Sequence, residues 1–384
     1  MNKTLLLTII VVSQFFGTSL WFSSNAVLNE IATAHHLENT NLLTSLTIAT
    51  QLGFILGSLC YAIFNLADRF KANRVFSISI FLGAIANASI LVPNLSFEQL
   101  FTFRFLTGVF LAGVYPVGMK IAAYFFPKTI SNALGVLVGA LVLGTAFPHF
   151  IASFKIKINW TFVILTSSLL ATLGGIIMLF LNTPAKKEMQ KINFSIIPQL
   201  FQKKEFRKAS FGYFGHMWEL YTFWAFTPLI LAHYKSINNV NYNIALWSFI
   251  VISIGSLGCV LAGKLAKTKT DVKVAKWAMT ISAICCILSP VAINLPPYVF
   301  FPFIIIWGVT VVADSPLLST LINAASLKNY NGTALTISTS IGFMLTIVSI
   351  YALKELLNYT SIATALPLLA IGPMIGIYQL RSKN

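Results

Sequence analysis

The chain has 384 residues, of which 57% are hydrophobic and only 9% are charged. Soluble domains carry about 25% charged residues, so this chain has too little polar surface to cover a globule in water. The composition excludes a set of soluble domains and predicts an all-α polytopic membrane protein. The formal net charge of +16 does not predict nucleic-acid binding, because most of the 26 Lys and Arg lie in short loops between apolar runs.

Twelve apolar segments are long enough to cross a bilayer, since about 20 helical residues span about 30 Å of hydrocarbon. Their predicted limits are 4–28, 42–64, 75–93, 98–126, 133–154, 160–182, 208–233, 243–266, 277–294, 298–324, 332–353 and 359–380. One long hydrophilic connection divides the segments six and six. We therefore predict an N-terminal six-helix bundle over 1–182, a basic cytoplasmic linker over 183–207 and a C-terminal six-helix bundle over 208–384.

The basic residues predict the orientation of these segments. If both termini are cytoplasmic, 20 Lys and Arg fall in cytoplasmic segments and 4 fall outside, namely Lys155, Lys157, Lys235 and Lys354. Basic loops are held on the cytoplasmic side of the membrane. We therefore expect a multi-pass protein of the bacterial inner (plasma) membrane with both termini in the cytoplasm.

The two halves of the chain resemble each other in sequence. Residues of the first half recur about 200 positions later, as in Gly108 with Gly308, Pro116 with Pro316, and Phe16-Gly17 with Phe214-Gly215. Such matches at nearly one offset predict that two parallel structural repeats make up the chain.

Two motifs indicate a family. The loop after the second segment reads Leu66-Ala67-Asp68-Arg69 with Arg74 following, and the fourth segment contains Arg104-Phe105-Leu106-Thr107-Gly108. With the twelve segments and the basic central loop, these residues resemble the G-x-L-a-D-r-x-G-r-k loop and the R-x-x-x-G pattern of the major facilitator superfamily (MFS). Phe64 and Lys71 stand at the two expected loop glycines, and Asn73 stands at one basic position.

This resemblance implies the MFS fold of twelve transmembrane helices in two six-helix bundles, and a secondary transporter as the activity. It also implies that Asp68, Arg69 and Arg74 act as a cytoplasmic gate, in which Asp68 pairs with a basic group or helix end in one state. A solvated loop is the structural alternative. The stretches GHMWELY, Ala313-Asp314-Ser315-Pro316 and Gly113-Val114-Tyr115-Pro116 are similar to a poorly characterised bacterial branch of permeases.

Two titratable residues lie deep in the seventh segment. A rise of about 1.5 Å per residue from Lys208 places Glu219 about 16 Å deep, near the midplane, with His216 one turn away on the same face. An ionised side chain there costs at least about 2.5 to 3.5 kcal/mol, so it is retained where it pairs, lines water or functions. We predict that Glu219 takes up and releases a proton and that His216 tunes it or holds solute. Polar contacts between helices are the structural alternative.

Further candidates lie in other segments. Asp314 either joins the proton-coupling site or satisfies backbone groups freed by Pro316. Arg104 is placed to bind an anionic solute or to pair between helices. We expect aromatic side chains to line the solute cavity together with Arg104 and His216, namely Trp21, Trp218 and Tyr221.

We therefore predict a secondary active transporter that moves a small anionic organic solute by alternating access with proton coupling. Its expected partners are the solute, the proton and the lipid bilayer, and we expect a monomer. The sequence offers no P-loop, no metal-ligand spacing and no convergent nucleophile and base, so no cofactor, metal or enzyme activity is expected. An exporter of a siderophore or toxic compound remains an alternative, as does a membrane sensor that binds solute without moving it.

Overall fold

The structure, a computed structural model, describes residues 2–37, 41–127, 129–154, 159–184, 194–327 and 330–381. Every regular element in these ranges is helical, as the composition predicts. The chain divides into two compact units, Met1–Lys191 and Ile192–Asn384, and each is described by itself. Several basic residues used to predict the orientation lie outside the described ranges, namely Lys128, Lys155, Lys157, Lys186, Lys187, Lys191, Lys328 and Lys383.

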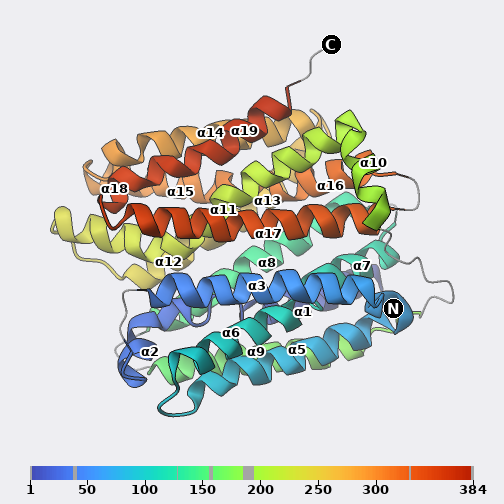
Figure 1. The fold of residues 1–384 in the computed structure, drawn as a ribbon, viewed down its shortest axis with the longest axis horizontal. Helices are drawn as coiled ribbons and strands as arrows, with labels where there is room; N and C mark the ends of the chain where they lie inside the picture. Colours follow the sequence, from blue (N-terminus) through green and yellow to red (C-terminus); the bar gives the residue numbers. More distant parts are fainter. Residues whose placement is uncertain are drawn as a thin grey trace. The chain divides into compact units, whose positions relative to one another are not determined.

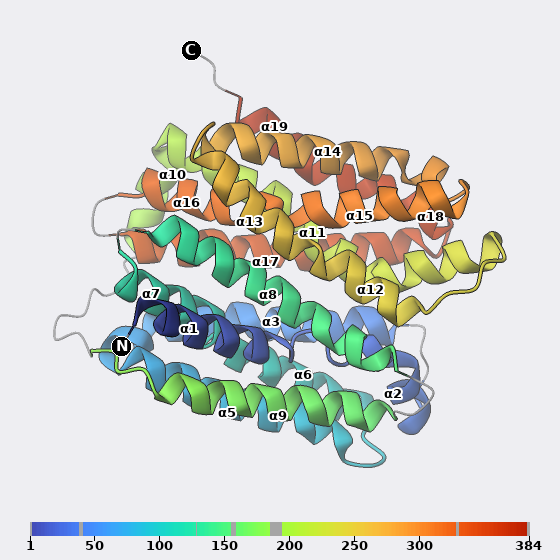
Figure 2. The same ribbon diagram turned by 180° about the vertical axis from the view of Figure 1, so that it is seen from behind.

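The first unit contains six membrane segments in chain order (Figure 1). Its elements are α1 (Lys3–Thr18), η1 (Asn25–Val27), α2 (Leu28–Ala34), α3 (Leu42–Ile63), α4 (Leu66–Arg69), α5 (Ala72–Ala88), η2 (Ser89–Leu91), α6 (Phe97–Leu111), α7 (Tyr115–Phe125), α8 (Ile130–Ala152) and α9 (Trp160–Leu179). The helices α5 and α9 lie side by side (Figures 1 and 2).

The second unit also contains six membrane segments. Its elements are η3 (Phe194–Ile196), α10 (Ile197–Gln202), α11 (Lys204–Ile237), α12 (Ile244–Ser253), α13 (Gly255–Ala266), α14 (Asp271–Ala292), α15 (Pro297–Ala313), α16 (Ser315–Ala325), α17 (Asn331–Leu356), α18 (Ile362–Ala365), η4 (Leu366–Ala370) and α19 (Ile371–Gln379). The long helix α11 packs against both α17 and α19.

Each of the twelve predicted segments contains helix, and ten of these helical stretches in the described chain are long and apolar enough to cross a membrane. The other two are α1, which has only 16 residues, and α11, which has 34 residues but includes His216, Glu219 and many aromatic side chains. Tyr and Trp carry polar groups on apolar rings, so α11 reads as less apolar than its neighbours. The predicted all-α polytopic fold is confirmed.

Several predicted segments contain more than one helix, and two of them are each interrupted just before a proline. The predicted segment 98–126 is divided into α6 and α7, and 298–324 is divided into α15 and α16. Pro116 and Pro316 each stand in the first turn of the second helix of their pair. Proline lacks a backbone N–H and is tolerated at the start of a helix, so the helix ends before it and a new one begins.

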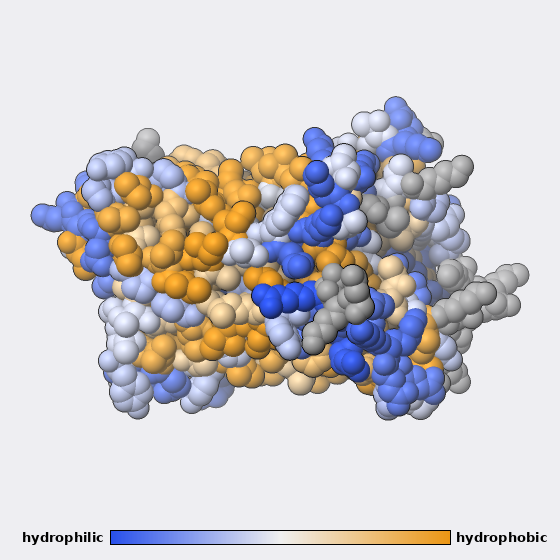
Figure 3. Space-filling view, turned by 90° about the horizontal axis from the view of Figure 1, so that it is seen from above, coloured by the Kyte–Doolittle hydropathy of each residue, from blue (hydrophilic) through white to orange (hydrophobic). Residues whose placement is uncertain are grey.

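Apolar side chains cover the outward surface of several helices. On α14, exposed side chains follow one another at helical spacing, namely Trp277, Ile281, Ile284, Ile287, Leu288 and Val291. Figure 3 shows one face of the molecule on which hydrophobic residues form a broad band between more hydrophilic residues. Such a surface is unfavourable in water and favourable in hydrocarbon, so the protein is a multi-pass membrane protein.

The predicted internal repeat is present in the helix packing. Glycines in each unit bring two helices so close that a side-chain carbon would overlap a backbone oxygen of the neighbouring helix. The corresponding pairs are Gly57 with Val109 and Gly258 with Val309, and Gly108 with Thr50 and Gly308 with Val251. Small residues allow this approach in membrane proteins, where close van der Waals packing holds helices together. The two units therefore have corresponding close helix contacts at equivalent glycines.

These contacts predict the effect of enlarging a repeat glycine. Replacing Gly308 with Ala would push a carbon into the Val251 carbonyl, which cannot move aside as a side chain would, so the variant should lose about 1–3 kcal/mol of stability. Gly263→Ala is the matched control, because nothing lies within 4 Å of a carbon added there. Thermal unfolding in detergent measures both, and equal midpoints for the two variants would contradict this packing.

Candidate functional site

The helix that carries the titratable pair lies in the interior of the second unit. Helix α11 contacts α19, α17, α16, α12 and α15. At Gly215 it approaches α19 so closely that an added side-chain carbon would overlap the carbonyl oxygen of Gly372. His216 and Glu219 are 1% and 2% exposed. Both side chains must therefore find their polar partners inside the protein.

Glu219 receives three hydrogen bonds on a single carboxylate oxygen. Its Oε1 accepts from Ser282 Oγ at 2.5 Å, from Trp307 Nε1 at 2.7 Å and from Cys286 Sγ at 3.1 Å. Ser282 and Cys286 are one turn apart on α14, and Trp307 lies on α15. Hydrogen bonds to an ionised acceptor are stronger than neutral ones, so the carboxylate joins three helices. Oε2, which none of these donors contacts, is left as the oxygen on which a proton would reside.

His216 and Asp314 form the second polar contact of α11. His216 Nδ1 lies 2.8 Å from Asp314 Oδ1, and both side chains are buried. The atoms are not aligned as a hydrogen bond, so the contact is electrostatic. Asp314 occupies the junction between α15 and α16, where its backbone oxygen accepts from the N–H groups of Leu317 and Leu318. Its side chain does not cap α16, so the carboxylate remains directed to His216.

The three residues predicted to couple protons thus lie in one buried cluster. Glu219 and His216 come from adjacent turns of α11, and Asp314 lies beside His216. Sequence reasoning missed the donors Ser282, Cys286 and Trp307. The spacing of Ser282 and Cys286 places them on one face of a helix, but it does not indicate which carboxylate they meet.

Two aromatic residues predicted to bind solute make packing contacts on other faces of α11. Trp218 Nε1 donates to the Leu368 oxygen of η4 at 3.2 Å. The ring centroid of Tyr221 lies 5.1 Å from that of Phe343 on α17 and 5.3 Å from that of Trp224. These contacts orient both side chains, and their roles in solute binding stay predictions.

Arg104 is fully buried in the first unit and is surrounded by protein oxygens. Its Nη1 donates to the Leu20 oxygen at 3.1 Å and to Asn87 Oδ1 at 3.0 Å, and its Nη2 donates to the Trp21 oxygen at 2.5 Å. Ser23 Oγ in turn donates to Asn87 Oδ1 at 2.6 Å. Arg104 has no carboxylate partner in the described part of the chain.

These contacts explain why the first predicted segment, 4–28, is not one continuous helix. Helix α1 ends at Thr18, and the next carbonyl groups, those of Leu20 and Trp21, bind the guanidinium of Arg104. Carbonyl groups at a helix end need such partners when they are buried. Arg104 therefore stabilises the turn between α1 and η1, and its predicted contact with an anionic solute stays a prediction, as does that of Trp21.

The predicted cytoplasmic gate contains an ion pair. Asp68 Oδ1 lies 2.7 Å from Lys120 Nζ of α7, and Lys120 also donates to the Ala67 oxygen. The guanidinium carbon of Arg69, Cζ, lies 5.7 Å from the ring centroid of Phe70. Asn65 adopts a left-handed conformation, with φ of 50°, and so provides the turn for which a glycine was expected one position earlier, at Phe64.

The loop departs from the family pattern at two positions that contact the end of the sixth segment. Lys71 Nζ donates to Asn182 Oδ1 at 2.9 Å, and Asn73 Nδ2 donates to the Leu181 oxygen at 2.5 Å. The Asn73 backbone N–H also donates to Thr183 Oγ1 at 3.1 Å. These departures therefore hold the loop against the chain that follows α9.

The described residues contain no group of three or more His, Cys, Asp or Glu that could hold a metal ion. The four cysteines are free thiols.

The repeated helical units, the apolar surface and the buried ionisable cluster define a polytopic helical membrane protein with polar groups in its interior. The chain belongs to the Major Facilitator Superfamily, because the sequence model of this family matches residues 7–350. The family resemblance expected from the sequence is therefore confirmed, and members of this family are transporters of small solutes.

Two solved structures share the fold. A mutant of the nucleoside transporter NupG aligns over 98% of each chain with a TM-score of 0.72 and 14% identity. A bacterial homologue of the human lysosomal transporter Spinster, in an inward-facing and unoccupied conformation, aligns over 98% of this chain and 94% of that chain, with a TM-score of 0.67 and 16% identity. At these identities the likeness shows the twelve-helix fold alone.

A closer sequence match is confined to part of the chain. The niacin transporter NiaP of Acinetobacter baylyi is 34% identical over 113 residues, which are 26% of this chain and 25% of that protein. The alignment therefore spans about a quarter of that relative's length.

The contacts of Arg104 predict a loss of stability when its guanidinium is replaced. Arg104→Lys keeps the charge but cannot reach the Leu20, Trp21 and Asn87 oxygens together, so it should lower the free energy of unfolding by about 1–3 kcal/mol. Thermal unfolding measures the loss, with the exposed Arg74→Lys as the matched control. Unchanged stability together with lost solute binding would instead assign Arg104 to the solute.

Proposed function

We propose that the protein is a proton-coupled secondary transporter that moves a small anionic organic solute by alternating access. The observation that carries this proposal is the carboxylate of Glu219, which is buried in the second unit with three donors on one oxygen. An ionisable group at this depth is costly and is retained for a reason.

Protonation of Glu219 would change how α11 is held. In the ionised state, Oε1 draws the Ser282 hydroxyl and the Trp307 indole toward α11. A proton on Oε2 removes the charge, which weakens both hydrogen bonds. The proton therefore has a different free energy in conformations that pack α11 differently, and this difference is what proton coupling requires.

His216 and Asp314 provide a second step of the proposed mechanism. A protonated His216 pairs favourably with Asp314 at 2.8 Å, whereas a neutral His216 leaves the carboxylate with weaker compensation. The contact joins α11 to the junction between α15 and α16. Charge at this pair would thus bias the position of the junction relative to α11.

We further propose that Asp68, Arg69 and Arg74 belong to a cytoplasmic gate. The ion pair between Asp68 and Lys120 would be present in one orientation of the transporter and broken in the other. Both residues are about one-third exposed, so the pair is screened by water and weak enough to exchange.

A small aromatic carboxylate is the solute that we propose to test first. The partial match to a niacin transporter supports a solute of this kind, because niacin is a small anion at neutral pH. In the second unit, Trp218 and Tyr221 would offer aromatic contacts to such a solute and His216 positive charge. In the first unit, Trp21 would offer an aromatic contact and Arg104 positive charge. We propose uptake by a monomer in a bacterial inner membrane with both termini in the cytoplasm. Export of a siderophore or toxic compound is the alternative direction and solute.

The proposal predicts how charge and Glu219 affect uptake. In proteoliposomes that are acidic outside, nicotinate should accumulate, whereas nicotinamide, which has the same shape and no charge, should not. Glu219→Gln keeps an acceptor for Ser282, Trp307 and Cys286 but cannot release a proton. This variant should lose accumulation by at least about tenfold while retaining exchange of nicotinate at equal pH on both sides.

Glu355→Gln is the control for this experiment, because Glu355 is an acid at the end of α17 that pairs with Lys354 outside the cluster. Accumulation by Glu219→Gln at the level of the unchanged protein would exclude Glu219 as the proton carrier. Equal accumulation of nicotinamide and nicotinate would exclude an anionic solute.

A further inference from the structure

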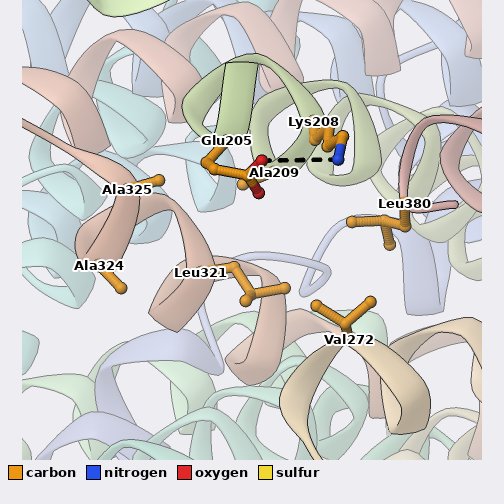
Figure 4. A pocket seen from close by; sticks show the side chains of 8 residues that line it. All are labelled: Glu205, Lys208, Ala209, Val272, Leu321, Ala324, Ala325 and Leu380. Atoms are coloured by element: carbon orange, nitrogen blue, oxygen red, sulfur yellow. Dashed lines mark ion pairs between the residues drawn. The ribbon is translucent and has the colours of Figure 1, made fainter. Parts of the chain in front are cut away.

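A pocket of about 310 Å³ lies in the second unit where the ends of four helices meet (Figure 4). Its lining residues are Glu205, Lys208 and Ala209 of α11, Val272 of α14, Leu321, Ala324 and Ala325 of α16, and Leu380 after α19. Glu219, His216 and Asp314 are not among these lining residues. The pocket is therefore separate from the proposed proton site.

The floor of this pocket is apolar. Leu321, Val272 and Leu380 surround the same space, and Ala324 and Ala325 are too short to fill it (Figure 4). One turn farther along α11, Gly212 lies close to the side chains of Leu318 and Leu380. The space thus offers a surface for a few methylene groups rather than a cage for a hydrated ion.

The helix ends that form the rim of the pocket carry more basic than acidic side chains, and Lys208 is the basic residue that lines the pocket itself. Lys208 is 20% exposed, and its Nζ lies 3.5 Å from the carboxylate of Glu205, which is 71% exposed. The distance between the charged groups is long and the Glu205 carboxylate is exposed to water, so the Lys208 ammonium group retains N–H donors for another anion. Two acids, Glu205 and Asp271, lie at the same ends of the helices. More basic side chains lie there, namely Lys203, Lys204, Arg207, Lys273, Lys276 and Arg381.

Contacts between the helix ends hold the rim in place. Lys203 Nζ donates to the Ser326 oxygen at 3.1 Å, which joins the start of α11 to the chain after α16. Arg207 Nη1 donates to the Phe201 oxygen at 3.3 Å and joins α11 to α10. Lys204, Lys273 and Arg381 are exposed and have no ion pair in the described part of the chain. They add positive charge around an already ordered pocket.

We propose that this pocket binds the phosphate headgroup of an anionic phospholipid. Lys208 and the basic rim hold the phosphate, while the glycerol and the first acyl methylenes lie on Leu321, Val272 and Leu380. The pocket lies at the ends of membrane-spanning helices, where lipid phosphates lie, and a basic residue near an anionic lipid surface contributes about 1 kcal/mol. A free phosphate shares the anionic group but gains nothing from the apolar floor.

Lipid titration of the purified protein, followed by native mass spectrometry, tests this site. Phosphatidylglycerol should bind at least about fivefold more tightly than zwitterionic phosphatidylcholine, and inorganic phosphate should not displace it at equal concentration. Lys208→Gln should weaken phosphatidylglycerol binding about fivefold. Ala325→Leu, which fills the pocket without changing charge, should weaken it by a similar factor, with Ala324→Leu as a second filling variant.

Lys354→Gln is the matched control, because Lys354 is 22% exposed and also pairs with a glutamate but lies outside the pocket. An equal loss in Lys354→Gln and Lys208→Gln, or unchanged binding in folded forms of both filling variants, would show diffuse surface attraction and overturn the proposal. Displacement of the lipid by inorganic phosphate would assign the pocket to a free anion and overturn it as well.

Discussion

A carboxylate in the middle of a helical membrane bundle must have hydrogen-bond donors, and this requirement organises the second unit. Glu219 would be prohibitively costly if it were buried alone. The hydroxyl of Ser282, the thiol of Cys286 and the indole of Trp307 meet this requirement together at Oε1. Because they come from α14 and α15, one ionised oxygen links three helices. The same linkage is the basis of the proposal that a proton on Glu219 changes the packing of these helices.

The first unit meets a comparable requirement with the opposite charge. Arg104 is buried among the oxygens of Leu20, Trp21 and Asn87 and so compensates the end of α1. Both units share the glycine contacts that set the spacing of their helices, as Gly108 and Gly308 show. The glycine contacts between helices are therefore the same in both units, while the buried polar residues differ. Arg104 thus stabilises the fold of the first unit, while solute binding by Arg104 and proton exchange by Glu219 and Asp314 are proposals.

Much of the fold was predictable from the sequence because hydropathy, Lys and Arg placement and glycine spacing are local properties. They predicted the helical segments and the internal repeat, which the structure contains, whereas the orientation and the depth of Glu219 in the membrane stay predictions. The break of α1 at Thr18 was not predictable, because it depends on Arg104, which is 86 residues away in the chain. The donors to Glu219 were also missed, since Ser282 and Trp307 are separated from it by 63 and 88 residues. From the sequence, Lys71 and Asn73 are only departures from the family motif. Their contacts with Asn182 and Leu181, which are more than 100 residues away, could not be predicted.

We propose that Glu219 takes up and releases a proton while the donors to Oε1 hold the Glu219 side chain in place. Infrared difference spectra of the protein in lipid, recorded between two pH values, observe this carboxyl group without any knowledge of the solute. A carboxylic acid C=O band should appear as the pH falls, shift in Trp307→Phe and be absent in Glu219→Gln. An unchanged band in Glu219→Gln would contradict it.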